Sequence, residues 1–433
     1  MKKFDKMNIV NEICEDAKGN PLIDLFGLAE VDINYDGNIE EVDKFPPLFV
    51  KGTIRDEKNA QLRGLLNAEK TLLTTPYLQV LCSLGYKITR VYQVWEFRSG
   101  RCLKHFIDEV VHERRKGDMP NGNPLQANTY KLIGNSFYGG SVMNKDDHSD
   151  VCYCQNRYEV CRQINKPMFI DAQEITDDLV ELHLNKNKIN QNVPIQVGKF
   201  ILDDAKIHMV NFYYYVIKAF CDIKKIDLIS MDTDSFTMAI AGKDLHNIVK
   251  DEYKEIWDTV VKQKWFCHEP CNPKTFCNMQ SNCNKRIPGP FKEEFSGQKA
   301  IGLSSKLYTV TSLKPGGDGT KTAAKGLKHQ NMYMDSSSLF EKVFENNDDS
   351  MTVTYSSIQR GKESMMTVNG SRTVSNKYTK RRVDDNDPSR TSTLRDVAYC
   401  GTPTKKRKLN MMKKNVRMKI KQKLEELRQC EQE

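Results

Sequence analysis

Two aspartates separated by one residue lie inside an apolar stretch of the sequence. Asp232 and Asp234 flank Thr233 in the segment 226–241, which otherwise favours two strands around a tight bend. In an extended chain alternate residues share a face, so both carboxylates are expected to point the same way while Thr233 points into the sheet. Carboxylates among apolar residues need a partner, and a hard cation such as Mg²⁺ meets that need. The pair predicts a metal site; a polar hairpin turn that happens to carry two acids is the alternative.

A second group of polar side chains falls on one face of an expected helix. Lys131, Asn135 and Tyr138 stand at positions i, i+4 and i+7 of a helical stripe. Lysine offers a phosphate a point charge, and tyrosine offers a base or sugar a flat surface. Gly139 leaves room for close approach of a backbone or ligand. The stripe predicts a nucleotide site; an amphipathic helix with Tyr138 in the core is the alternative.

The exact strings around these residues resemble a known family. The string Lys131-Leu132-Ile133-Gly134-Asn135-Ser136-Phe137-Tyr138-Gly139 is followed by Asp232-Thr233-Asp234-Ser235, and together they resemble motifs B and C of family B DNA polymerases. The protein-primed branch of linear plasmids, viruses and self-synthesising transposons is the most similar. Three further segments show a looser likeness to the family. Lys306-Leu307-Tyr308 resembles a Lys-x-Tyr motif, Gly289 to Glu294 resembles the segment before that motif, and Lys380-Arg381-Arg382 resembles a late basic element. The resemblance spans roughly residues 27–395.

The resemblance implies a role for each matching residue. Asp234 would be the main metal ligand, with Asp232 beside it, in a two-metal Mg²⁺ site of which this chain supplies half the ligands. Lys306 and Tyr308 would grip the primer strand. Lys131 would bind the triphosphate, and Arg114 or Arg115 would be a second phosphate ligand. The full set of implied nucleotide-binding residues is Lys131, Asn135, Ser136, Tyr138, Gly139, Arg114 and Arg115.

Some of the family's pattern is missing from the chain. Motif A, an Asp-x-x-Ser-Leu-Tyr-Pro string, is not found, nor are the carboxylates of a 3′–5′ exonuclease, and Ser230 replaces the tyrosine that usually precedes motif C. The sequence therefore resembles the C-terminal part of a DNA-directed DNA polymerase. A catalytically inactive remnant that still binds nucleic acid is the alternative, and an RNA-directed enzyme is a more distant one. The expected partners are a DNA template-primer, deoxynucleoside triphosphates and, by family branch alone, a protein primer.

The elements expected around these residues give an α+β fold, a partial polymerase right hand. Helices are expected over 101–116 and 125–138 around a breaker at 117–124, over 198–220, and largely over 62–85. Strands or extended segments are expected over 27–33, 46–50, 87–94 and 303–310. The expected domains are an N-terminal palm or terminal-protein-region-like segment (1–95), a fingers hairpin (96–140), an accessory insertion (141–195), a palm (196–310), a thumb-like region (311–395) and a basic tail (396–433).

Charge and composition bound the remaining possibilities. The net charge is +9, but residues 380–433 hold sixteen Lys or Arg against eight Asp or Glu, so the body is nearly neutral and must contact DNA through local basic clusters. No run of about 18 apolar residues occurs, so no membrane span is expected. Thirteen scattered cysteines are typical of an intracellular protein.

Two weaker signals lie in the second half of the chain. Cys267, Cys271, Cys277 and Cys283 have no tight Cys-x2-Cys pair, so a cysteine-rich loop is favoured over a Zn²⁺ site. The run Lys405-Lys406-Arg407-Lys408 resembles a nuclear import signal or a phosphate-binding patch, with a disordered tail and a mitochondrial location as alternatives.

Overall fold

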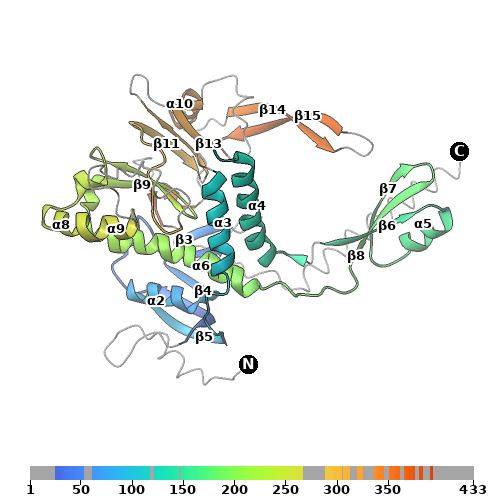
Figure 1. Cartoon of the computed structure of the whole chain (residues 1–433), viewed down its shortest axis with the longest axis horizontal. Helices are drawn as coiled ribbons and strands as arrows, with labels where there is room; N and C mark the ends of the chain where they lie inside the picture. The colour runs from blue at the N-terminus through green and yellow to red at the C-terminus, as the bar shows by residue number, and fades with distance from the viewer. Residues whose placement is uncertain are drawn as a thin grey trace. The chain divides into compact units, whose positions relative to one another are not determined.

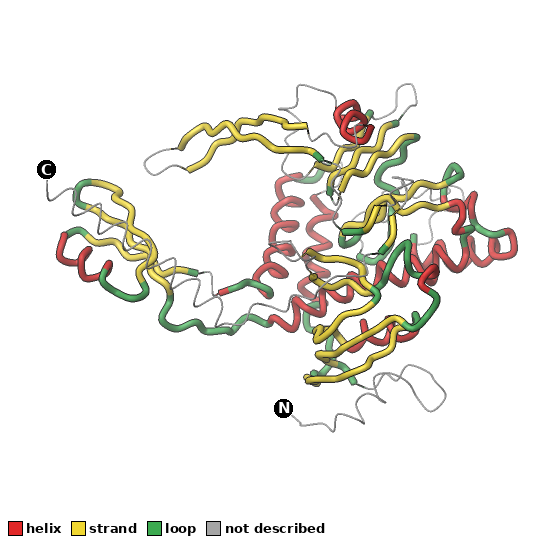
Figure 2. The backbone as a smooth tube through the Cα atoms, turned by 180° about the vertical axis from the view of Figure 1, so that it is seen from behind, coloured by secondary structure: helices red, strands yellow, loops and turns green. Residues whose placement is uncertain are grey.

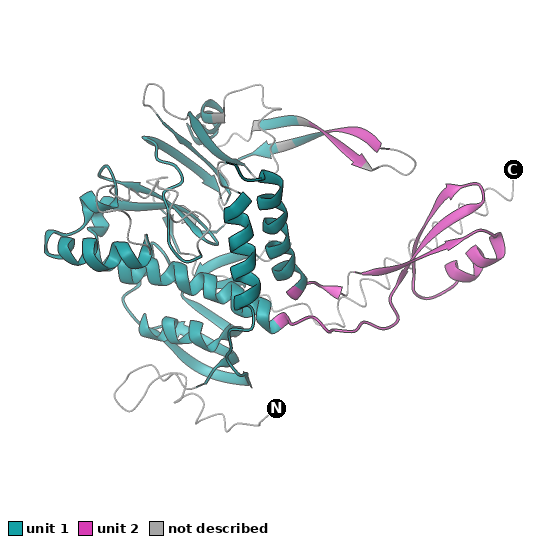
Figure 3. Cartoon of the chain, in the orientation of Figure 1, with its two compact units in different colours: residues 1–140, 196–355, 370–399 teal, residues 141–195, 356–369, 400–433 magenta. Residues whose placement is uncertain are grey.

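The computed structural model describes most of the chain and leaves out the segments whose placement is uncertain. The described residues are 25–52, 61–117, 121–145, 148–266, 288–304, 306–312, 319–324, 336–345, 351–360, 365–375, 380–383 and 391–393. The four cysteines considered as a Zn²⁺ site and the basic run 405–408 lie outside these ranges, so the structure does not test either prediction. The chain divides into two compact units, one of residues 1–140, 196–355 and 370–399 and one of 141–195, 356–369 and 400–433 (Figure 3).

Small antiparallel sheets and helices alternate along the chain, which confirms the expected α+β class (Figure 1). The first sheet has the strand order β4-β1-β5, with α2 packed against it. Ala29, Val31 and Ile33 alternate along β1 and are fully buried, so the strand turns one face to the core. The elements of this part are β1 (Gly27–Tyr35), η1 (Ile39–Glu41), β4 (Asn67–Thr74), α2 (Thr75–Ser83) and β5 (Tyr86–Glu96).

The helix expected over most of residues 62–85 is wrong in its first half. Residues 61–65 form β3 (Gln61–Leu65), which pairs with β2 (Leu48–Gly52), and the next residues form β4 along β1. The spacing of the leucines in 62–66 imitates a helical stripe, but pairing with distant strands decides the structure. Only 75–83 is helical, and Pro76 stands in its first turn rather than at a break.

Two antiparallel helices lie side by side in both views of the chain (Figures 1 and 2). They are α3 (Lys104–Gly117) and α4 (Pro124–Ser141), close to the expected bounds. Their contact is made by the rings of Phe106 and Phe137, whose centroids are 5.1 Å apart. Gly134 of α4 faces Val110 of α3, because a Cβ added at Gly134 would lie 3.4 Å from the Val110 side chain. The predicted helical hairpin is confirmed.

A long helix passes between the first sheet and the next part of the chain. It consists of α6 (Ile195–Asn211), a π-helical segment η3 (Phe212–Ile217) and α7 (Lys218–Phe220), as the apolar stretch 198–220 predicts. Ile207 packs against the first sheet, and Val210 and Tyr213 pack in a cluster with residues of the following hairpin. That hairpin is β9 (Ile226–Asp232) and β10 (Ser235–Ile240), the two strands predicted around the aspartates.

A helical layer of short segments follows the hairpin and closes an aromatic core. Trp257 is fully buried there, and the rings of Phe212 and Phe291 stack with centroids 4.1 Å apart. These segments are η5 (Leu245–Ile248), η6 (Asp251–Tyr253), α8 (Lys254–Ile256), η7 (Trp257–Val261) and α9 (Lys262–Trp265), and a further short segment, η4 (Ile223–Lys225), precedes the hairpin.

The strand expected over 303–310 is two strands joined by a tight turn. Lys306 stands in that turn with φ of +60°, a backbone conformation that residues other than glycine rarely adopt. The sheet has the order β11-β12-β13 and packs against α10, and its turn carries no glycine or asparagine that would have indicated it. Its elements are β11 (Lys299–Ser304), β12 (Leu307–Thr311), β13 (Thr320–Ala324) and α10 (Ser336–Glu345).

The remaining described strands form short hairpins. β14 (Met351–Arg360) pairs with β15 (Met365–Val374), and β16 (Arg382–Val383) pairs with β17 (Thr391–Ser392). None of the described helices is long and apolar enough to cross a membrane.

The second unit holds a three-stranded sheet of order β6-β8-β7 with one helix against it. Leu182 at its centre is fully buried. The elements are β6 (Ser149–Cys154), α5 (Arg157–Ile164), β7 (Phe169–Thr176) and β8 (Leu179–Asn185).

Candidate active site

The two aspartates flank the tip of the β9–β10 hairpin. Asp232 pairs with Ser235 across the hairpin, so Thr233 and Asp234 form a two-residue turn. Thr233 has φ of +53°, unfavourable for a β-branched residue, and the amide of Asp234 donates to the carbonyl of Asp232. The expectation that both carboxylates point from one face of an extended strand is wrong, because the turn begins directly after Asp232. The turn instead brings the two residues to the exposed end of the hairpin.

The hairpin is held in place by aromatic packing behind the turn. Phe236, two residues beyond Asp234, lies with its ring centroid 5.4 Å from Phe45 and 6.1 Å from Phe212. Leu228 and Met231 of the other strand pack in the same cluster. The apolar residues of the two strands therefore anchor the hairpin in the core while its polar tip stays in solvent.

The Asp232 carboxylate has two neighbours and a free oxygen. Lys306 Nζ lies 3.1 Å from Oδ1, and the Thr233 hydroxyl donates to the same oxygen at 3.3 Å. Oδ2 accepts no hydrogen bond from the described residues, and neither does the exposed carboxylate of Asp234. The side chain of Asp232 is 40% exposed. The turn thus offers carboxylate oxygens that a ligand from solvent can reach.

Lys380, which is far from Asp232 along the sequence, lies near the Asp232 carboxylate in the structure. Burial lowers the pKa of Lys380, as do the nearby cations of Arg63 and Lys306, while the charge of Asp232 raises it. Arg63 itself is buried and donates to the carbonyl of Gly52. Two lysines, Lys306 and Lys380, therefore lie near the Asp232 carboxylate.

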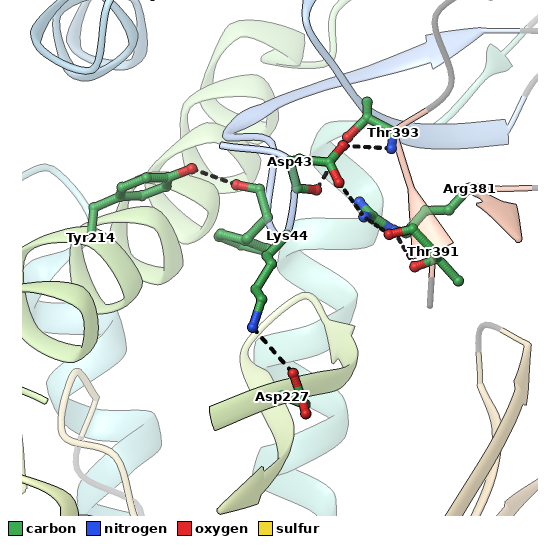
Figure 4. A network of polar contacts seen from close by, with 8 residues as sticks. Asp43, Lys44, Tyr214, Asp227, Arg381, Thr391 and Thr393 are labelled. Atoms are coloured by element: carbon green, nitrogen blue, oxygen red, sulfur yellow. Dashed lines mark hydrogen bonds and ion pairs between the residues drawn. The ribbon is translucent and has the colours of Figure 1, made fainter. Parts of the chain in front are cut away.

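A polar network fixes the segment that carries Lys380 (Figure 4). Arg381 lies 3.6 Å from the Asp43 carboxylate and donates to Thr391, and the Thr393 amide donates to Asp43 at 2.7 Å. Next to Asp43, Lys44 donates to the Asp227 carboxylate at 3.2 Å at the start of β9. One short loop therefore ties both the late basic segment and the aspartate hairpin in place.

Sequence reasoning missed this loop. The basic element at 380–382 was noticed, but Asp43, Lys44 and Asp227 carried no signal. Thr393 and Asp43 are 350 positions apart, and no local pattern links residues at that distance. Arg63 was missed as well, although a single arginine among apolar strand residues is the kind of residue that needs a buried partner.

The implied nucleotide-binding residues lie on the α3–α4 hairpin. Lys131 and Asn135 are exposed on α4, with Ser136 beside them, whereas Tyr138 is half-buried, and burial raises the pKa of its hydroxyl. An added Cβ at Gly139 would meet nothing within 4 Å, so the space beside it is open.

The last turn of α3 gathers cations around a buried acid. Arg114 and Arg115 are half-buried in it, and Lys116 lies 3.3 Å from the buried Glu113 carboxylate, to which Gln126 of α4 also donates. Among the described residues, no hydrogen bond or ion pair joins the hairpin to Asp232 or Asp234. The structure therefore brings Lys306 to Asp232, whereas the stripe of Lys131, Asn135 and Tyr138 has no ion pair or hydrogen bond to either aspartate among the described residues.

The residues present fit a hard divalent cation in part. The carboxylates of Asp232 and Asp234, on either side of Thr233, supply oxygen ligands. Mg²⁺ commonly takes only one or two carboxylates and completes its shell with waters and substrate phosphates. Within the described ranges no group of three or more His, Cys, Asp or Glu comes together. Tyr308, the other implied primer contact, is half-buried in β12.

Comparison with known proteins gives one match. The family model of DNA polymerase type B, organellar and viral, matches residues 3–219, half of the 433-residue chain. The matched region includes the α3–α4 hairpin and ends before the aspartate turn. No curated protein and no solved structure matches the chain. The family match covers the string Lys131 to Gly139 and half of the chain, and the chain therefore belongs to the organellar and viral type B DNA polymerase family.

Proposed function

We propose that this chain adds deoxynucleotides to the 3′ end of a DNA primer under the direction of a template, with Asp232 and Asp234 as its metal-binding acids. The observation that carries the proposal is the exposed turn at the tip of an anchored apolar hairpin, with a free carboxylate oxygen on Asp232 and Lys306 at 3.1 Å. Membership of a DNA polymerase family supplies the reaction class. A protein primer is suggested only by the branch of that family.

Each half of the site has its own task in this proposal. Asp232 and Asp234 would hold Mg²⁺, which would supply positive charge to the attacking primer hydroxyl and to the leaving pyrophosphate. Lys131, with Arg114 or Arg115 from the facing helix, binds the triphosphate, and Asn135, Ser136, Tyr138 and Gly139 shape the pocket around the sugar and base. Lys306 and Tyr308 hold the primer strand.

The right-hand arrangement belongs to the same proposal. The α3–α4 hairpin serves as fingers, residues 196–310 as the palm and 311–395 as a thumb-like region, while 1–95 forms the N-terminal part of the palm and 141–195 an accessory insertion. For the hairpin to act, Lys131 and the turn at Asp232 must face one nucleotide at the same time. The hairpin and the turn each bind their own part of the substrate. The order in which these two parts bind can therefore be tested.

Primer extension with the full chain tests the proposal. A labelled primer-template is incubated with deoxynucleotides and Mg²⁺, and incorporation is compared for the wild type, Asp232→Asn and Asp234→Asn. Because metal ligation is worth several kcal/mol in the transition state, each substitution should reduce incorporation by about 100-fold or more. Lys262→Met, on the surface helix α9, is the matched control and should leave incorporation unchanged.

Two other outcomes would contradict the proposal, one its metal site and the other its activity. Incorporation that survives both aspartate substitutions contradicts the proposed site. Tight binding of the primer-template with no incorporation by the wild type contradicts the proposed activity and assigns the chain to the alternative, a polymerase relative that binds nucleic acid without turnover.

A further inference from the structure

Lys306 and Asp232 form an ion pair, but the proposed function gives each of them a different binding partner. Lys306 Nζ lies 3.1 Å from Asp232 Oδ1, with the two side chains 48% and 40% exposed. In the proposed reaction Asp232 holds a divalent cation and Lys306 contacts the primer strand. The observed pair and those two contacts compete for the same charges, so the pair has to open when substrate binds.

The backbone on both sides keeps the two groups at this distance. Lys306 and Thr233, the neighbour of Asp232, both stand in left-handed backbone conformations, with φ of +60° and +53°. The strands behind the turns are in contact, because a Cβ added at Gly302 of β11 would lie 3.0 Å from Ile229 of β9. Two tight turns backed by touching strands therefore hold the lysine beside the carboxylate without help from a ligand.

The surrounding charge favours an exchange of partners rather than a permanent pair. Lys380 is close enough to Lys306 and Asp232 for both to affect its pKa, and Arg63 affects it as well. Asp232 is thus an anion beside two lysines, Lys306 and Lys380. Once its charge is offset by a divalent ion instead, the lysines gain affinity for another anion, and a DNA backbone supplies phosphates that ammonium groups bind readily.

We propose that Lys306 alternates between two anions, the Asp232 carboxylate in the free protein and a DNA phosphate in the complex, so that divalent cation and primer-template bind with positive coupling. The inference rests on the proposed function. Only ionic contacts change: the ammonium leaves the carboxylate as the cation arrives and takes up the phosphate, and no proton or covalent bond is transferred. Coupling between two binding events is reciprocal, so each ligand must raise the affinity of the other by one common factor.

Two titrations without turnover measure that factor. Mn²⁺ binding is followed by the loss of its free electron paramagnetic resonance signal, with and without primer-template. Primer-template binding is followed by fluorescence anisotropy with and without Ca²⁺, at fixed ionic strength because affinity for DNA depends strongly on salt. In the wild type each ligand should raise the affinity of the other by roughly tenfold, within the usual range of such coupling.

Lys306→Met should change both titrations in a specific way. With its competitor removed, Asp232 should bind Mn²⁺ more tightly in the absence of DNA, and the coupling factor should fall to about one. Lys306→Arg should restore most of the coupling, because it keeps the charge. Lys321→Met is the matched control: Lys321 lies in the same sheet, pairs with Glu294 at 3.2 Å, and should leave the coupling intact.

The outcomes distinguish failure of this inference from failure of the proposed function. If Asp232→Asn leaves Mn²⁺ binding unchanged, the metal site itself is wrongly assigned, and both fall. If Asp232→Asn weakens Mn²⁺ binding but Lys306→Met leaves both the Mn²⁺ affinity and the coupling as in the wild type, the exchange is wrong while the metal site stands. A thermal melt of each variant, expected to match the wild type, verifies that the effects arise in a folded protein.

Discussion

Asp203 and Asp232 both have lysine partners, but their surroundings differ greatly. Asp203 on α6 is fully buried; Lys199 and Lys206 lie 2.9 and 3.0 Å from it, and the Thr74 amide donates to it at 3.1 Å. Asp232 is 40% exposed, with one lysine and a free oxygen. Burying a charge is costly unless the charge is paired and hydrogen-bonded, and Asp203 meets that condition.

The difference separates a structural carboxylate from one that can exchange ligands. Asp203 joins α6 to the end of β4, and Lys206 also lies over the ring of Tyr77, whose hydroxyl donates to Pro47. All these contacts are internal and leave no position for a ligand. Asp232 is partly open to solvent, and its charged partner, Lys306, is itself 48% exposed. Residue type and charge are the same in both clusters, so exposure and the number of partners decide the role.

The largest effect is expected at the buried cluster. Asp203→Ala leaves two partly buried lysines without their anion and frees the Thr74 amide, so it should lower the free energy of unfolding by about 3–5 kcal/mol. Urea denaturation measures the change. Asp251→Ala is the control, because Asp251 pairs with Lys254 at the same i,i+3 spacing but is exposed; it should change stability little. Equal effects at the two positions would contradict the structural role of Asp203.

The two lysines of the buried cluster should be strongly coupled. Lys199→Met or Lys206→Met alone leaves Asp203 one cation, whereas the double variant leaves a buried carboxylate with only an amide partner. The double variant should therefore lose more stability than the sum of the single variants, by about 0.5–3 kcal/mol. Strict additivity in a double-mutant cycle would contradict the expected coupling of the two lysines through Asp203.

Acid should remove the contribution of Asp203. Burial alone would raise the pKa of Asp203, but the charges of Lys199 and Lys206 outweigh it and hold the pKa below its ordinary value of 3.8. A depressed folded-state pKa stabilises the protein above the unfolded-state value and loses that effect as pH falls through the folded-state value. The stability difference between the wild type and Asp203→Asn should thus be full near neutral pH and shrink below about pH 3.8. A difference that grows in acid would reverse the assigned direction.

The smallest effect on stability is expected at the exposed aspartate. Asp232→Asn removes one half-exposed ion pair, so the free energy of unfolding should change by no more than about 1 kcal/mol. The same substitution should abolish metal-dependent incorporation. A large loss of stability would place Asp232 in the structural class with Asp203.

The sequence predicted those parts of the fold and site that depend on local patterns. The α3–α4 hairpin and the β9–β10 hairpin followed from periodicity and breakers, and the family followed from the strings around Lys131 and Asp232. Local patterns gave wrong or no predictions where contacts between residues far apart in the sequence determine the structure. The leucines after Gln61 mimic a helix but pair as strands, Lys306 turns the chain without a glycine, and the contact of Asp43 with Arg381 joins opposite ends of the described chain. The predicted direction of the two carboxylates was wrong for a related reason: the alternation of a strand ends at Asp232, where the turn begins.

Cleavage by a bound iron ion tests the central claim most directly. Fe²⁺ replaces Mg²⁺ at many oxygen-ligand sites, and with ascorbate and peroxide it cuts the polypeptide near the place where it binds. The account predicts cuts at residues 232–235, with further cuts near Lys306 and Lys380, all suppressed by excess Mg²⁺ and lost in the Asp232→Asn, Asp234→Asn double variant. Cuts that cluster elsewhere, or that persist at the turn in the double variant, would contradict it.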